Sequence, residues 1–445
     1  MSQNGDLRLS CPDLLERITA HYLESAHFNG LPLHTLSLQE ATGEQETELS
    51  QRIMPMREPP KQPSEEIVRA VRELVESGHV TVVFGDVHPN PHIRAFSDER
   101  KATTLAKLLG KDIGHACLYP TAEHLKTVIN PIEYGDRPYA LELALGGAQL
   151  EHRAFDMHVL EPYRNDPRFS YQTNDISGQI NVKSGDLGLK ESEEVYLRFG
   201  FCYDDDENRY VAVFRWDLFK LSSDVQRMWK MREANKITRL HPDYFRNAIM
   251  GDFAQHYSMY EAFGRELRVI NQISVALGRP NLFRQDYVEN RPRGFEALLR
   301  PTLKEFNDFV RVLDSMISDN INLKFFQDDV PLERDVERKD GKVQVERKGS
   351  IKVLQEWIER RFRPKDKAPM EEMFATFREI RRLRNKPSHT PTEDEFSIEI
   401  AANQRDLMKR AYGAVRLLRL VLANHPGAGA VKVDEHLADG RIWTI

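Results

Sequence analysis

The stretch that decides the fold of the C-terminal third is residues 373–389, which read Met373-Phe-Ala-Thr-Phe377-Arg-Glu-Ile380-Arg-Arg-Leu-Arg384-Asn385-Lys386-Pro387-Ser388-His389. Positions i, i+4, i+7 and i+11 put three apolar side chains and Arg384 on one face of a helix. Pro387 disfavours helix at the residue before it, so we expect the helix to end near Lys386, with His389 just beyond. A guanidinium on an apolar face is costly unless an anion meets it. The stretch therefore predicts a bundle helix whose C-terminal end presents a cation to an anion.

Three further helices are predicted around this one. Pro301 opens an amphipathic helix at its first position, and another helix follows over residues 350–362. The capping box Thr392-Glu-Asp-Glu395 starts a last helix, which stops near Asn424. A two-stranded insert separates the first two helices and carries the tight-turn dipeptide Asp340-Gly341. Together these elements predict an antiparallel helical bundle with an inserted β-hairpin.

The N-terminal two thirds have a different character. Short, partly alternating apolar runs predict strands at residues 80–84, 139–145, 155–160, 179–182, 195–203 and 209–216. We therefore expect an α+β multidomain protein, with a mixed, mostly antiparallel β-rich N-terminal domain followed by helices and the C-terminal bundle. The predicted division is a short helical segment with a polar Pro-rich linker (1–63), an α+β domain (64–220), a helical connecting region (221–295), the bundle (296–425, hairpin insert 330–349) and a C-terminal tail (426–445).

Composition narrows the classes of function. The 445 residues carry a net charge of −6, which excludes a globally basic nucleic-acid binder but not a local basic patch. Residues 350–424 contain 16 Lys and Arg against 11 Asp and Glu, a local charge of +5, so the remaining residues carry −11 by difference. The sequence has no apolar run of the roughly 20 residues that a membrane span needs, and no signal-peptide core. Three widely spaced cysteines indicate neither a disulfide scaffold nor a zinc site, so we expect a cytoplasmic protein with no membrane association.

Arginine and histidine without a carboxylate cluster suit phosphodiester chemistry that needs no metal. RNA carries its own nucleophile, the 2′-hydroxyl, so an enzyme need only hold the phosphate, neutralise developing charge and move protons. An arginine can grip two phosphate oxygens at once. Exposed carbonyls at a helix C-terminus favour the charged form of His389, as befits an acid or base working near neutral pH.

The run from Arg384 to His389 resembles the signature of the HEPN superfamily, an arginine, often a following asparagine, and a histidine four to six residues on, late in a helical bundle. This resemblance covers roughly residues 296–424. It implies a homodimer in which two copies of the motif form one composite ribonuclease site, and a toxin or antiviral defence effector that cuts RNA without metal or cofactor. It also implies that Arg384 binds the scissile phosphate, that His389 is the general acid or base, and that Asn385 orients the phosphate or the arginine, with Ser388 and Arg381 in support. The N-terminal region would then regulate this site through a protein or a small ligand.

Two other interpretations remain open. Arg384 could pair with Glu379, Glu395 or an acid of a neighbouring helix, and the bundle would then be a non-catalytic nucleotide- or protein-binding module. The run Asp86-Val-His88, with His92 nearby, follows a predicted strand and resembles the first metal motif of calcineurin-type phosphoesterases. The further metal motifs of that family are not found in this sequence, and one Asp with two His cannot build a two-metal site alone.

Overall fold

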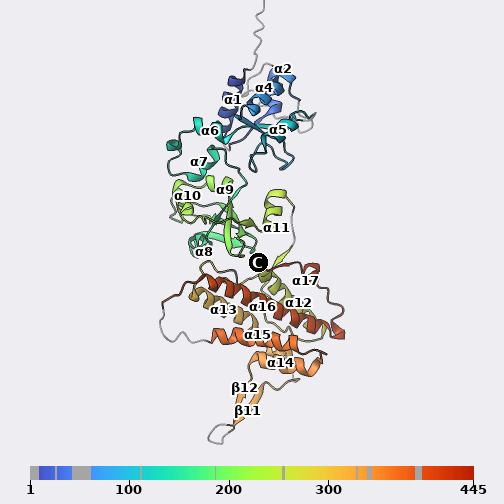
Figure 1. The fold of residues 1–445 in the computed structure, drawn as a ribbon. Coiled ribbons are helices and arrows are strands. Elements are labelled where there is room, and N and C mark those ends of the chain that lie inside the picture. The colour runs from blue at the N-terminus through green and yellow to red at the C-terminus, as the bar shows by residue number, and fades with distance from the viewer. Residues whose placement is uncertain are drawn as a thin grey trace, which may run out of the picture.

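The computed structural model describes residues 10–25, 28–42, 62–110, 113–185, 187–252, 256–326, 329–337, 343–385 and 393–444. The chain has the predicted mixed α+β architecture, with antiparallel sheets in its N-terminal two thirds and a helical bundle with an inserted hairpin in its C-terminal third. Figure 1 shows three parts in a row, an N-terminal part, a middle part and the bundle, with the hairpin projecting from the far end. None of the described helices combines the length and apolar character needed to cross a lipid bilayer.

The N-terminal part is a three-stranded antiparallel sheet covered by helices. Its strands lie in the order β1 (Leu31–Pro32), β3 (Cys117–Pro120) and β2 (Val80–Val83). Its helices are α1 (Cys11–Glu24), α2 (Leu33–Thr42), α4 (Glu65–Glu76), α5 (Lys101–Lys107) and α6 (Ala122–Val128). Ser64 caps α4, where its Oγ accepts a hydrogen bond from the Ile67 amide at 3.3 Å.

Two predicted boundaries in this half of the chain are wrong. Residues 1–63 were expected to lie apart from the α+β domain, but Leu14 and Ile18 of α1 are buried in one core with Val71 of α4. Residues 64–220 were expected to form one domain, but they contribute to two separate sheets with separate cores. Most of the polar stretch read as a linker, residues 43–61, lies outside the described residues.

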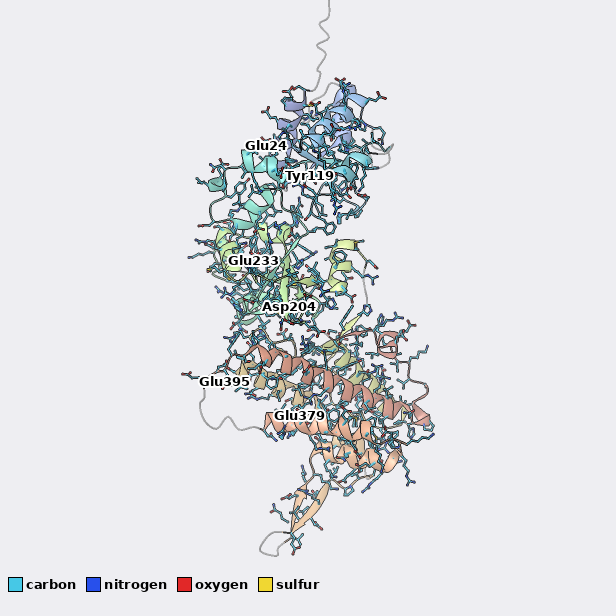
Figure 2. The ribbon with its side chains drawn as sticks, in the orientation of Figure 1. Glu24, Tyr119, Asp204, Glu233, Glu379 and Glu395 are labelled. Carbon is cyan, nitrogen blue, oxygen red and sulfur yellow. The ribbon has the colours of Figure 1, made fainter. Side chains whose placement is uncertain are left out.

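The middle part is an antiparallel sheet in the order β4 (His152–Phe155), β8 (Arg209–Phe214), β7 (Leu197–Tyr203), β6 (Ser177–Val182) and β5 (Phe169–Thr173), with β9 (Arg239–Leu240) paired to β7. The strands predicted at 195–203 and 209–216 are confirmed as β7 and β8, which pair as a hairpin with Asp204 in its turn (Figure 2). The accompanying helices are α7 (Pro138–Ala144), α8 (Glu161–Asn165), α9 (Arg215–Phe219), α10 (Ser223–Lys230) and α11 (Pro242–Phe245). Two predicted strands are wrong. Residues 139–145 instead form α7, with Pro138 in its first turn. Of residues 155–160, only the first ends a strand, and residues 157–160 form a 3-10 helix.

The bundle extends over more of the chain than predicted, and one apolar core runs through it. Among the described residues, its helices are α12 (Met259–Ala276), α13 (Leu303–Ile317), α14 (Ser350–Arg361), α15 (Ala368–Arg384) and α16 (Ile398–Ala423). Residues 221–295 were expected only to connect domains, yet α12 is part of this core and pairs with α16 through the buried ion pair of Glu266 and Arg419. The segment at 426–445 is not a free tail either, since Leu437 of α17 (Glu435–Asp439) is fully buried and β13 (Ile442–Trp443) pairs with β10 (Tyr257–Ser258).

The hairpin and the start of the last helix were only partly predicted. The insert forms β11 (Glu333–Glu337) and β12 (Val343–Arg347), paired antiparallel, while the predicted turn residues Asp340 and Gly341 lie outside the described residues. The last helix α16 begins at Ile398 with Ser397 as its N-cap, not at the predicted capping box. Thr392 of that box also lies outside the described residues.

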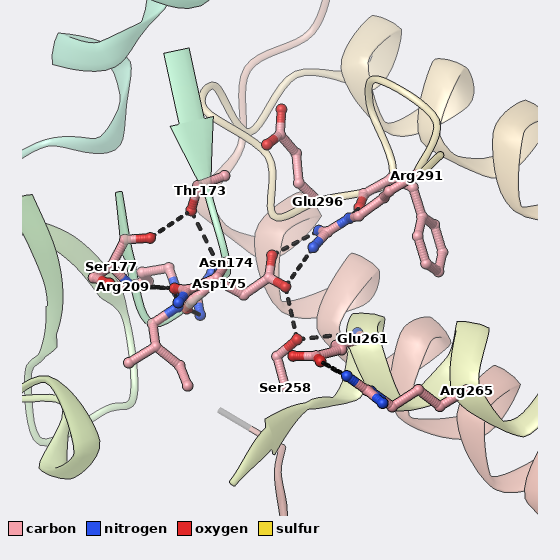
Figure 3. Close-up of polar contacts among 12 residues, drawn as sticks. Thr173, Asn174, Asp175, Ser177, Arg209, Ser258, Glu261, Arg265, Arg291 and Glu296 are labelled. Atoms are coloured by element: carbon pink, nitrogen blue, oxygen red, sulfur yellow. Dashed lines mark hydrogen bonds and ion pairs between the residues drawn. The ribbon is translucent and has the colours of Figure 1, made fainter. Parts of the chain in front are cut away.

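A buried ion pair joins the middle part to the bundle (Figure 3). Asp175, in the turn between β5 and β6, receives hydrogen bonds from Nη1 and Nη2 of Arg291 at 2.6 Å each and from Oγ of Ser258 at 2.7 Å. Ser258 is also the N-cap of α12. The Asp175 side chain is 2% exposed, and its backbone has a φ of +69°, a left-handed conformation that costs energy for any residue but glycine. The middle part is therefore anchored to the N-cap of α12 and to the segment after that helix through a carboxylate that is shielded from water.

Candidate functional site

The C-terminal end of α15 carries the arginines of the candidate site. The helix buries its predicted apolar face, including Met373, Phe377 and Ile380, and ends at Arg384 with Asn385 as its C-cap. Three arginines in its last turn, Arg384 among them, face the negative end of the helix dipole, which stabilises them. The predicted helix is thus confirmed, and it ends close to the expected residue.

An acidic pair from α13 and the residues that follow it meets these arginines. Nη1 of Arg384 donates to Oδ2 of Asp314 and to Oδ2 of Asp319, both at 2.6 Å. Nη1 of Arg381, one turn earlier, donates to the same two carboxylates at 2.7 Å and 3.0 Å. We call Asp314 and Asp319 the acidic pair. The charges of the two acids and the two arginines sum to zero. The anion that we expected Arg384 to meet is therefore supplied by the chain itself.

The two acids differ in burial. The Asp314 side chain is 0% exposed, and its other oxygen accepts a hydrogen bond from Oγ of Ser318 at 2.7 Å. The Asp319 side chain is 44% exposed. Burial alone would raise the pKa of Asp319, but hydrogen bonds from Arg384 and Arg381 outweigh it, and the pKa is lowered. The hydrogen bonds that Arg384 donates to the acidic pair raise the pKa of Arg384, so its guanidinium stays charged.

The acidic pair fixes the orientation of the Arg384 guanidinium through only one of its three nitrogens. Its hydrogen bonds to described residues all leave from Nη1, and Nε and Nη2 donate to none of them. The side chain as a whole is 30% exposed. A guanidinium edge of two N–H donors matches two oxygens of a phosphate. Holding the group in place beforehand removes part of the entropic cost of binding such an anion.

The remaining predicted site residues divide into two groups. Asn385 and Arg381 lie beside Arg384 at the end of α15. Ser388 and His389 lie outside the described residues. Two acids that the sequence offered as partners of Arg384 are labelled in Figure 2: Glu379 pairs with Arg410 of α16, and Glu395, which precedes α16, makes no ion pair with Arg384.

The acidic pair was missed from the sequence, although a signal for one member exists. Asp314 stands four residues after Val310 and beside Leu313, within the apolar stripe of α13. A carboxylate in such a stripe needs a cationic partner for the same reason that Arg384 needs an anion. Asp319 follows the helix in a polar stretch and gives no comparable signal.

The alternative site at residues 86–92 does not assemble. Asp86 pairs with Lys107, and hydrogen bonding from that lysine lowers the pKa of Asp86. Nδ1 of His88 accepts a hydrogen bond from the Asn90 amide at 3.3 Å, and Nδ1 of His92 lies 3.8 Å from Sγ of Cys117. Within the described part of the chain, no three His, Cys, Asp or Glu side chains converge in a way that could hold a metal.

Comparison with protein-family models, with curated proteins and with solved structures found no match to this chain.

Proposed function

We propose that this chain is a metal-independent endoribonuclease that cleaves RNA with Arg384 and His389. One observation carries the proposal: the acidic pair holds Nη1 of Arg384, Nε and Nη2 donate to no described residue, and the same sequence motif contains a histidine. A fixed, charged donor edge can bind a phosphate and stabilise the negative charge that develops during cleavage. The net positive charge of residues 350–424 supports a polyanionic substrate.

The proposed reaction is an internal transfer on the RNA strand. A base removes the proton of a ribose 2′-hydroxyl, and the 2′-oxygen forms a bond to the adjacent phosphorus. The bond from phosphorus to the 5′-oxygen of the next nucleotide breaks, and an acid gives that oxygen a proton. The products are a 2′,3′-cyclic phosphate and a 5′-hydroxyl. His389 serves as the acid or base, and Arg384 with Asn385 holds the phosphate.

One Arg–His motif supplies half of such a site, so the proposal includes a homodimer with two motifs at its interface. The chain would act in the cytoplasm as a toxin or defence-type effector. Regulation is assigned to the N-terminal two thirds, through a protein or small ligand. The buried pair of Asp175 and Arg291 supports this assignment, because it gives the middle part a direct hold on the bundle.

The test is cleavage of total RNA and of tRNA by the full-length protein in EDTA. Wild type is compared with Arg384→Ala, His389→Ala and Arg382→Ala. Arg382 is the matched control, because it lies on the same turn of α15, is exposed and makes no ion pair or hydrogen bond with a described side chain. We expect the first two variants to lose at least about 100-fold in rate, the usual contribution of a general acid or of a transition-state donor. Arg382→Ala should keep near-normal activity. Cleavage that survives both Arg384→Ala and His389→Ala would contradict the proposal.

A non-catalytic binding module is the second candidate. One observation favours it: the acidic pair and the two arginines Arg381 and Arg384 together carry no net charge. Such a neutral group of ion pairs is also what a purely structural role would produce. This candidate predicts that wild type and the Arg384→Ala variant are equally inactive while RNA or nucleotide binding is retained. Measuring binding beside cleavage in the same samples separates the two functions.

A further inference from the structure

A cavity of about 560 Å³ lies beside the candidate site, where the residues after α13, the start of α14 and the middle of α15 meet. Its charged lining residues are all cationic, namely Lys352, Arg378 and Arg381. Uncharged polar groups, including Ser318, Ser350 and Gln355, complete the lining. A hollow with three cations and no acid on its walls attracts an anion.

The cations in this cavity are incompletely neutralised. Nη1 of Arg378 donates to the uncharged Oε1 of Gln355 at 3.0 Å, and no carboxylate among the described residues pairs with Arg378. Lys352 lies 3.9 Å from Glu356, but that acid is also held by Lys348 at 2.7 Å. Arg381 shares the acidic pair with Arg384. The cavity therefore keeps a positive charge that its own residues do not balance.

The backbone of α14 adds donors to the same wall. Gly349 is the N-cap of this 12-residue helix and provides no side-chain cap. The first N–H groups of a helix have no intrahelical partner, and the helix dipole is positive at that end. Gly349, Ser350 and Ile351 all line the cavity, so these donors lie at the same hollow as the three cations.

The cations also form a row along α15. Arg378, Arg381 and Arg384 recur every three residues, so their Cα atoms span about 9 Å along the helix axis. Arg384 stands at the C-terminal end of this row, at the proposed cleavage site. Arg378 stands at the other end, in the cavity, and Arg381 belongs to both. An extended polyanion matches this row better than a single ion does.

We infer that the cavity binds a backbone phosphate of single-stranded RNA, on a nucleotide flanking the one held by Arg384. This inference rests on the proposed function, since it assigns the substrate strand a path along α15 into the cavity. The ligand chemistry is a phosphate carried by a nucleotide. Free nucleotides offer the same group, so they form a separate arm of the test.

Binding is measured by fluorescence anisotropy, with a labelled single-stranded RNA of about 12 nucleotides and the full-length chain. His389→Ala is present in every sample so that the probe stays intact. Gly349→Asp places a carboxylate at the helix start, and the site accepts it because the backbone φ is −65° and a Cβ there meets nothing within 4 Å. Arg378→Gln removes one exposed charge. Arg382→Gln is the matched control, from the same helix but outside the cavity lining.

We expect Gly349→Asp to raise the Kd for RNA by about ten-fold or more, the effect of losing one charge-assisted contact. Its thermal midpoint should equal or exceed that of the parent, because Asp is a better N-cap than Gly. Arg378→Gln should raise the Kd about three- to ten-fold and lower the slope of log Kd against log salt by about 0.7, the share of one phosphate on a single strand. Arg382→Gln should change the Kd less than two-fold, about the level of a surface substitution.

Unchanged RNA affinity in both Gly349→Asp and Arg378→Gln would overturn the inference. Displacement of the RNA by ATP or inorganic phosphate at concentrations near the Kd of RNA would overturn the assignment to a strand. The proposed function fails separately, in the cleavage assay with Arg384→Ala. A protein that binds RNA through the cavity but does not cleave it keeps the inference and loses the nuclease. If the protein cleaves RNA and both cavity variants bind RNA with normal affinity, the nuclease proposal stands and the inference about the cavity fails.

Discussion

Asp314 is a fully buried carboxylate that accepts hydrogen bonds from Arg381, Arg384 and Ser318. We expect Asp314→Asn to lower the free energy of unfolding by about 1–3 kcal/mol, because it leaves two guanidiniums with a single, half-exposed acid. Urea denaturation of the full-length protein measures this loss. Both arginines keep Asp319 as a partner, so the loss should stay below that of a fully unpaired buried charge.

Asp308 provides the control for this change on the same helix. It pairs with Arg311 at 3.2 Å, and both side chains are more than half exposed, so Asp308→Asn should cost at most about 0.5 kcal/mol. Equal losses of unfolding free energy in Asp314→Asn and Asp308→Asn would show that the burial of Asp314 does not add to stability.

The lowered pKa of Asp319 predicts how the stability of the protein changes with pH. Its folded pKa lies below the ordinary value of 3.8, so the stabilisation is complete above that value and is lost as the pH falls through the folded pKa. Wild type should therefore lose stability more steeply than Asp319→Asn as the pH falls below about 4. Thermal unfolding at a series of pH values measures the two curves. Parallel curves would mean that the Asp319 carboxylate does not couple to folding.

At the scale of elements, strong periodicity was a more reliable guide than short apolar runs, some of which formed strands and some helices. The residues from Met373 to Arg384 repeat with a helical period over several turns, and α15 formed as predicted. The run at 139–145 is too short for its period to distinguish strand from helix, and Pro138 with the buried Tyr139 and Leu143 made it a helix. The partner of Arg384 could not be read locally, because Asp314 is 70 residues away and only the packing of α13 against α15 brings them together.

The turn between β5 and β6 should be a critical element for stability. Asp175→Asn keeps the size of the side chain and tolerates the positive φ, but it leaves Arg291 without its carboxylate. We expect a loss of about 2–4 kcal/mol in unfolding free energy, since removing one partner of a buried pair leaves an uncompensated charge. Thermal unfolding of the full chain is the measurement. Asp205→Asn, which breaks a pair that is largely exposed, is the control and should be nearly neutral.

At the scale of the whole molecule, composition and pattern predicted the α+β class and the order of its parts, but not the boundaries. The helix at residues 11–24 completes the core of α4 across a polar stretch, and α12 joins a bundle that was expected to begin at residue 296. Both errors have one physical cause. A core forms between surfaces that pack together in the folded chain, and these surfaces can come from helices that are far apart in the sequence.

The proposed composite site would make activity depend on assembly. If two motifs form one site, a monomer has half of it, so specific ribonuclease activity should fall when the protein is diluted below its dimer dissociation constant. Sedimentation velocity and cleavage rates over the same concentration series test this. Excess Arg384→Ala protein should also inhibit wild type by forming mixed dimers, whereas excess Arg382→Ala should not. Specific activity that stays constant through the monomer transition would contradict a shared site.

The anchor between Asp175 and Arg291 has a mechanical consequence. The turn that holds Asp175 belongs to a hydrogen-bonded hairpin, and its partners are the first turn of α12 and the segment that leads into α13, the helix of Asp314. The same two parts are also joined by ion pairs of Arg164, in α8, with Glu296 and Glu305. A force on the middle part is thus transmitted to the start of α12 and to the segment before α13, and all of these contacts together resist it.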